Sequence, residues 1–80
     1  MAAAVKTGRL KALAVYKEEA VVKISNTSYY FFVEHLGPNG WQGAVAILLA
    51  AWQSGEEVTI EYEAVNNKRF AQSVSFGSFS

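Results

Sequence analysis

The 80-residue chain has no cysteine and a single histidine, His35. The first absence excludes disulfides and metal sites built from thiolates, and the second excludes a metal site rich in histidine. We therefore expect no cofactor and no structural metal. A domain this small often needs support from disulfides, metals or oligomerisation, and oligomerisation is the support that remains.

The chain also has no excess of one charge, because seven basic residues balance seven acidic ones and the formal net charge is zero. A protein that binds nucleic acid non-specifically carries a basic excess that displaces counterions from the phosphates. We therefore expect no nucleic-acid partner. A net charge near zero also removes the repulsion between copies of the chain.

Long apolar runs are missing as well. The first residues, MAAAVKTGRLK, lack the continuous apolar stretch of a secretory leader, which fits a cytoplasmic protein or a secreted one whose leader has been removed. Residues 36–55 carry no charge, but glycine, proline and asparagine occupy residues 37–40. The remaining apolar centre is about half of the length that a membrane span needs, so we expect no membrane span.

What the chain does have is a composition that is 51% hydrophobic and 14% aromatic, which supports one packed domain over residues 1–80. Asn66 and Asn67 tolerate positive φ and predict a hairpin turn at residues 65–68. Apolar alternation and β-branched residues predict five strands, at residues 8–16, 20–24, 29–35, 56–64 and 69–76.

One helix is predicted from about residue 41 to residue 53, after a loop in which Asn39 is a plausible N-cap. Its centre, AVAILLAAW, is apolar almost all the way round, whereas an ordinary surface helix has one apolar stripe. The strand at residues 29–35 is aromatic on both faces. A second copy of the chain would cover both elements. We therefore predict an oligomer interface made of Val45, Ile47, Leu48, Ala51, Trp52, Tyr30 and Phe32.

The element order, three strands, one helix and two strands, predicts a β-rich α+β fold, namely a small five-stranded OB-like barrel (β-β-β-α-β-β) with one apolar central helix. Residues 29–77 also resemble the receptor-binding B subunits of AB5 bacterial toxins. The likeness is carried by YYFFVEH, GWQGAVAILLAAWQSG and EEVTIEYEAVNNKRFAQSVSFG. The resemblance implies a ring-shaped homopentamer, with the helices lining its centre, that binds cell-surface glycans. It assigns no sugar-binding residue, because no position matches a binding motif.

The sequence carries no recognisable catalytic constellation. His35 follows Glu34, but the two would point to opposite faces of a strand, and no serine lies at a spacing that assigns a triad. We expect no enzyme, no catalytic residue and no metal ligand. The acidic residues Glu56, Glu57, Glu61 and Glu63 are interpreted as a solvated face.

Ligand-binding residues are predicted in loops and at exposed aromatic side chains. Trp41 follows a glycine-rich loop, and the loop between the last two strands is a common ligand loop of OB-folds. The predicted set is His35, Asn39, Trp41, Asn66, Asn67 and Lys68.

These patterns predict a non-enzymatic homo-oligomeric binding protein, a pentamer if the resemblance extends to assembly, for a glycan or another small polar ligand. The alternative is a structural or protein-interaction module whose self-assembly is its main property and whose partner is another protein. A glycan binder should present an exposed aromatic beside asparagine, glutamine or acidic groups. A scaffold would place its aromatics in subunit contacts.

Overall fold

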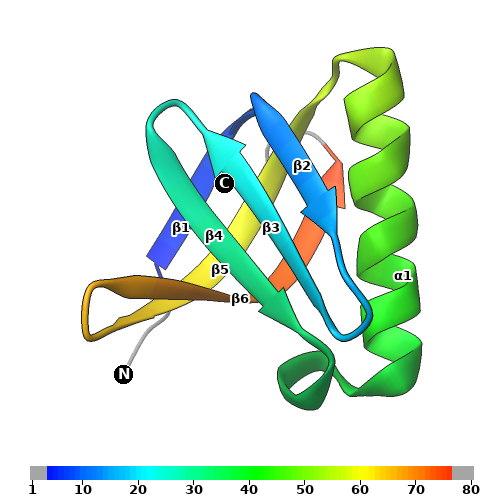
Figure 1. The fold of residues 1–80 in the computed structure, drawn as a ribbon. Helices are drawn as coiled ribbons and strands as arrows, with labels where there is room; N and C mark the ends of the chain where they lie inside the picture. The colour runs from blue at the N-terminus through cyan, green and yellow to red at the C-terminus, as the bar shows by residue number, and fades with distance from the viewer. Residues whose placement is uncertain (1–3, 77–80) are drawn as a thin grey trace.

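A computed structural model describes residues 4–76 of the chain. They form six strands in one sheet and one long helix (Figure 1), which confirms the prediction of a small β-rich α+β fold. The elements are β1 (Ala4–Arg9), β2 (Ala12–Val15), β3 (Glu19–Ile24), β4 (Thr27–Phe32), α1 (Val33–Ser54), β5 (Glu57–Val65) and β6 (Lys68–Phe76).

The sheet has the order β1-β5-β6-β4-β3-β2 and is not closed, so β1 and β2 are its two edges. All neighbouring strands are antiparallel except β4 and β6, which run parallel with Tyr30 opposite Phe70. The sheet folds over on itself, so that β2, β3 and β4 lie in front of β1, β5 and β6, and α1 runs along one side (Figure 1).

The sheet has six strands rather than the predicted five, because residues 8–16 do not form one strand. The chain breaks at Leu10 and Lys11, after which β2 pairs with β3, whereas β1 pairs with β5. Gly8 allows β1 to pass close to β3, since a Cβ atom there would lie 2.6 Å from Cγ2 of Ile24. Two segments that are consecutive in the sequence thus form opposite edges of the curled sheet.

Alternation along β4 agrees with the prediction that both of its faces are aromatic. Tyr29 and Phe31 point into the core and are 2% and 0% exposed, whereas Tyr30 and Phe32 are half-buried on the opposite face. The strand ends at Phe32, earlier than predicted, so the residues up to His35 belong to α1. We call the side of the sheet that carries Tyr30 and Phe32 the outer face.

Helix α1 begins at Val33, well before the predicted start, and is kinked at Gly37 (φ 77°, ψ 161°). Glycine adopts this positive φ without strain, and Pro38 restarts the helix because its fixed φ suits a first helical position. The break therefore lies at Gly37, and Asn39 is an exposed residue within the helix. The helix ends near the predicted position, where Gly55 (φ 74°) donates its N–H to the carbonyl of Ala51 at 2.8 Å.

The core lies between α1 and the inner face of the sheet. The helix contributes Ala44, Leu48 and Ala51 to it. Leu49 and Trp52 are 44% and 48% exposed, so the helix buries one side within its own chain and leaves another apolar side open. The sheet contributes Ala20, Val22, Ile24, Tyr29, Phe31, Val58, Ile60 and Ala71.

Strands β5 and β6 form the predicted hairpin, in which Asn66 and Asn67 both have positive φ, 52° and 67°. Simple alternation along β6 would place Phe70 and Val74 on one face, but the two residues lie on opposite faces. A register shift opposite Glu61 and Tyr62 inserts an extra residue in β6, so that Val74 packs against the core while Phe70 lies on the outer face.

Candidate ligand-binding site

The half-buried aromatic residues of the outer face form one cluster. The ring centroid of Phe70 lies 5.6 Å from that of Phe32 and 6.5 Å from that of Tyr30, and the rings of Tyr30 and Phe32 stack at 6.4 Å. The cause is the parallel pairing of β4 with β6, which places Phe70 directly beside Tyr30. Aromatic rings at these separations attract one another, which fixes the cluster in place.

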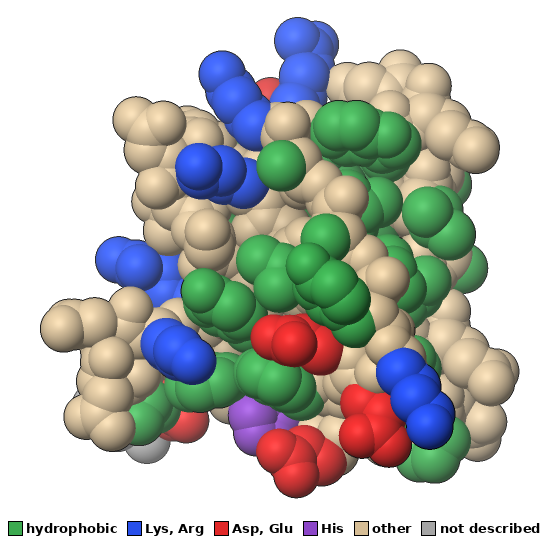
Figure 2. All heavy atoms as spheres, viewed as in Figure 1, with side chains coloured by type: hydrophobic (Ala, Val, Ile, Leu, Met, Phe, Trp, Pro, Cys, Tyr) green, Lys and Arg blue, Asp and Glu red, His purple; other side chains and the backbone are tan. Residues whose placement is uncertain are grey.

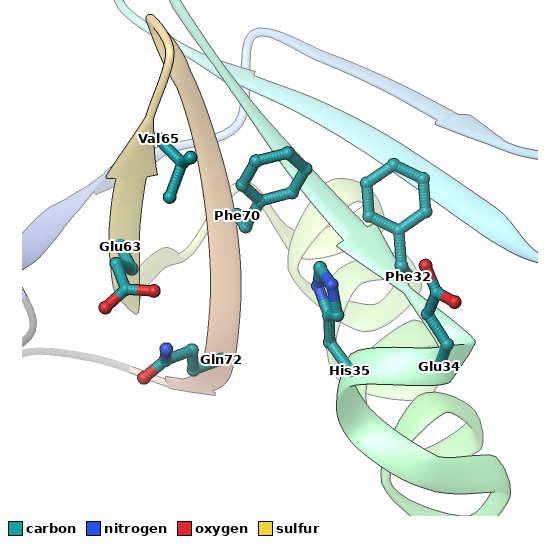
Figure 3. Close-up of a pocket in the computed structure, with 7 residues that line it drawn as sticks. All are labelled: Phe32, Glu34, His35, Glu63, Val65, Phe70 and Gln72. Atoms are coloured by element: carbon teal, nitrogen blue, oxygen red, sulfur yellow. The ribbon is translucent and has the colours of Figure 1, made fainter.

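His35 joins this cluster from the first turn of α1. Its ring centroid lies 5.5 Å from that of Phe32 and 5.4 Å from that of Phe70, at interplanar angles of 73° and 83°. The short helical segment before Gly37 is responsible, because it turns the chain back beside the end of β4 (Figure 3). The segment of α1 before the kink therefore positions His35, the only histidine of the chain.

A cavity of about 730 Å³ lies against these rings. One wall is the hairpin of β5 and β6, and the other is the start of α1 (Figure 3). Its volume falls within the range of about 300–1,000 Å³ that is usual for small-ligand sites. We call this cavity the aromatic pocket; its described lining consists of Phe32, Glu34, His35, Glu63, Val65, Phe70 and Gln72.

The lining combines apolar rings with hydrogen-bond acceptors. Glu34 and Glu63 supply two carboxylates and Gln72 supplies an amide, whereas no lysine or arginine is found in the described lining. The rings can hold an apolar part of a ligand, and the carboxylates accept hydrogen bonds from its polar groups. The pocket can therefore bind and orient a small amphipathic molecule.

A second hollow, of about 370 Å³, adjoins the aromatic pocket, because Phe32 and Glu34 line both. Its other wall is formed by Glu18, in the turn between β2 and β3, and by Glu19, the first residue of β3. The carbonyl of Glu18 accepts a hydrogen bond from the backbone N–H of Val33 at 3.2 Å, which ties this turn to the start of α1. Acidic side chains therefore continue along the surface beyond Phe32.

Behind the cluster, on the inner face, Tyr29 packs edge-on against Tyr62 with ring centroids 5.0 Å apart. Burial raises the pKa of the Tyr29 phenol, and the neighbouring Tyr62 raises it further, while the charge of Arg69 opposes the shift. The phenol of Tyr29 is therefore a neutral group that belongs to the core.

Two of the predicted ligand-binding residues lie at this cluster. His35 lines the aromatic pocket, and the Nζ of Lys68 lies 5.4 Å from the ring centroid of Tyr30. Asn66 and Asn67 form the exposed tip of the hairpin, next to the pocket residue Val65.

The other two predicted ligand-binding residues do not line the aromatic pocket. Trp41 is half-buried and packs against the core, and Asn39 is exposed on α1. Sequence reasoning missed Phe70, Glu63 and Gln72. The pairing of the third and last strands that an OB-like barrel implies could have pointed to Phe70, because it brings an aromatic of one strand beside an aromatic of the other.

The predicted interface residues lie in three environments. Leu48 and Ala51 are buried in the core of their own chain. Tyr30 and Phe32 belong to the outer-face cluster. The remaining three are on α1, where Val45 and Ile47 are half-buried and Trp52 is exposed.

No protein-family model matches the chain, and a comparison with curated proteins finds no similar one. Residues 4–76 contain no group of three or more histidine, cysteine, aspartate or glutamate side chains placed to hold a metal ion. In that part of the chain no helix has the length and apolar character needed to cross a membrane. Function is therefore inferred from the geometry of the site.

Proposed function

We propose that this protein is a non-enzymatic, homo-oligomeric binding protein that holds a small polar ligand, such as a glycan, in the aromatic pocket. The observation that carries the proposal is the composition of this cavity, in which Phe32, His35 and Phe70 lie beside Glu34, Glu63 and Gln72. Rings supply contact area, and a few acceptors orient the ligand. Aromatic rings that stay half-buried beside acidic and amide groups favour a binder over a scaffold.

The strand order supports an OB-like interpretation of the sheet. Taken together as one broken strand, β1 and β2 pair with β5 at one end and with β3 at the other. This arrangement is expected of a partly open five-stranded Greek-key barrel. In OB-folds, ligands bind on the second and third strands and the adjoining loops. The smaller hollow lies at the turn between β2 and β3, and both hollows reach Phe32 at the end of β4.

The open side of α1 supports self-association. Val45, Leu49 and Trp52 follow one another at helical spacing, so their side chains share one side of the helix. Residues 36–55 carry no charge, so a contact between copies along this side buries no unpaired charge. A pentameric ring is the assembly that the resemblance to the toxin B subunits predicts.

The binding proposal is tested on a glycan array with the labelled full chain. We expect retention on a restricted set of glycans and a loss of about tenfold in affinity for Phe70→Ala, which removes a ring from the pocket. Val15→Ala is the matched control, because Val15 is an exposed apolar residue that lines neither hollow. Identical binding by wild type and Phe70→Ala would contradict the proposal.

The assembly proposal is tested by light scattering coupled to size exclusion. We expect a native mass near five chains for the wild type and a monomer for Leu49→Glu, whose charge falls on the open side of α1. Ala50→Glu places the same charge on a different side of the helix and should keep the wild-type mass. A monomeric wild type would contradict the proposal of a pentameric ring. An oligomer that retains no ligand would favour the second candidate, a module whose assembly is its function.

A further inference from the structure

We propose that the aromatic pocket selects an organic cation, an alkylammonium or guanidinium group such as the side chain of a lysine or arginine, over a neutral sugar. This inference rests on the proposed function, since it names the ligand class of the same pocket. It is carried by the charges around the pocket, by the rings that line it, and by a contact within the chain itself.

The charge around the two connected hollows is negative. Glu34 and Glu63 line the aromatic pocket, and Glu18 and Glu19 line the adjoining one, where Lys17 is the one basic residue of the described lining. Four of the seven acidic residues of a chain with zero net charge are therefore gathered here. Figure 2 shows acidic side chains around the histidine at the lower end of the view, where basic side chains also lie to either side, and further basic side chains at the upper end.

The rings of the pocket suit a cation. Phe32 and Phe70 are tilted by 41° with centroids 5.6 Å apart, and His35 lies against both. The negative faces of aromatic rings attract ammonium and guanidinium groups that come within about 6 Å of a centroid, and clustered rings are the usual receptor for alkylated ammonium ions. In this pocket the aromatic rings and the carboxylates would therefore both attract the same cationic ligand.

The chain already holds one cation against this aromatic cluster. The Nζ of Lys68 lies 5.4 Å from the ring centroid of Tyr30, and Tyr30 stacks on Phe32 at an interplanar angle of 11°. An ammonium group of the chain therefore already lies against Tyr30, on one side of the cluster. On the other side, Phe32 lines the aromatic pocket, where the charged residues of the described lining are carboxylates.

A neutral ligand would suit the pocket less well. Covering Glu34 and Glu63 with an uncharged molecule removes water from two carboxylates without giving either a counter-charge, which is unfavourable. A cation compensates both charges and gains the attraction of the rings. The same reasoning predicts that binding weakens as salt screens the carboxylates.

The inference is tested by NMR titration of the full-length wild type with four probes: N-acetyl-lysine amide, N-acetyl-arginine amide, the uncharged N-acetyl-norleucine amide and methyl glucoside. We expect one of the two cations to shift the resonances of Phe32, His35 and Phe70 and to bind about tenfold more tightly than the uncharged probes. A short lysine- and arginine-containing peptide is the fifth probe. Tighter binding of the peptide than of the free derivatives identifies a polypeptide ligand, and equal binding identifies a small amine.

The variants separate charge from shape. Glu63→Gln keeps the shape of the pocket wall, and we expect it to weaken cation binding several-fold while leaving any binding of methyl glucoside unchanged. Glu57→Gln is the matched control, because Glu57 is an exposed residue at the other end of the same strand, opposite Arg9. It should bind the cations as the wild type does.

Two outcomes overturn the inference, and they are distinguishable. If methyl glucoside binds more tightly than the cations and Glu63→Gln binds as the wild type, the pocket is a neutral-ligand site, and the proposed binding function survives. If none of the probes shifts the pocket resonances and the glycan array is also empty, the inference and the proposed function fall together.

Discussion

Along β4, Tyr29 and Phe31 are sealed in the core, whereas Tyr30 and Phe32, one residue away in each case, stay half-exposed on the outer face. The inner pair is covered by α1 and by the curl of the sheet. The outer pair has Phe70 and the aromatic pocket beside it. The same residue types therefore stabilise the fold on one face and form an open aromatic cluster beside a cavity on the other, because α1 and the curl of the sheet cover only the inner face.

The largest expected difference is between truncations on the two faces. Phe31→Ala should lower the free energy of unfolding by about 3–5 kcal/mol, since it leaves a cavity in the core. Phe32→Ala should cost about 1 kcal/mol, since its ring is only half-buried. Urea unfolding followed by circular dichroism measures both values. Equal costs would show that the outer face is as well covered as the core.

A second test adds a methyl group instead of removing a ring. Gly8→Ala should destabilise the protein by about 1–3 kcal/mol, because the new Cβ would meet Ile24 on the inner side of the sheet. Gly43→Ala lies in open space on α1 and should stabilise by about 0.5–1 kcal/mol. Thermal unfolding compares the two. A neutral Gly8→Ala would mean that β1 can move away from β3 without loss.

The third test uses pH. Because burial raises the pKa of Tyr29, the folded protein keeps the phenol proton at an alkaline pH at which the unfolded chain has already lost it. The stabilisation that this phenol gives the folded state is fully present below the usual tyrosine pKa of about 10. It is lost as the pH rises through the higher pKa of the folded protein. Unfolding free energies across the alkaline range should therefore fall less steeply for Tyr29→Phe than for the wild type. Parallel curves would place Tyr29 outside the core.

The smallest effect concerns the hairpin that forms one wall of the aromatic pocket. Asn67 has φ 67°, a conformation that is unfavourable for alanine but not for glycine. Asn67→Ala should therefore lower the free energy of unfolding by about 1 kcal/mol, whereas Asn67→Gly should change it by only about 0.3 kcal/mol. Chemical unfolding of both variants measures the difference. If the two are equally stable, the turn relaxes to another conformation, and the pocket wall is less fixed than the core.

The sequence predicted the parts of the fold that depend on local signals. The positions of β3 and β5, the asparagine turn and the two aromatic faces of β4 all follow from alternation and turn chemistry. The break between β1 and β2 has no glycine or proline at Leu10 and Lys11 to announce it. It arises because the two halves of the segment pair with different strands, which is a long-range effect.

The same limit applies to the helix and to the pocket. The early start of α1 places His35 against Phe32 and Phe70, and the rings of Phe32 and Phe70 come together because β4 pairs with β6. Sequence reasoning named His35 and Lys68 as candidates. It did not find Phe70, because a pairing across the whole of α1 leaves no local signal in the sequence.

The split first strand also has a consequence for how the chain folds. The hydroxyls of Thr7 on β1 and Thr59 on β5 lie 2.9 Å apart although 52 positions separate them in the sequence. During synthesis β2, β3 and β4 can pair with their neighbours early, whereas β1 has no partner until β5 has emerged, and such distant pairings slow folding. An unpaired strand is a template for aggregation. The nascent chain is therefore exposed to that risk at β1 until β5 has emerged, and at the free side of β4 until β6 has emerged.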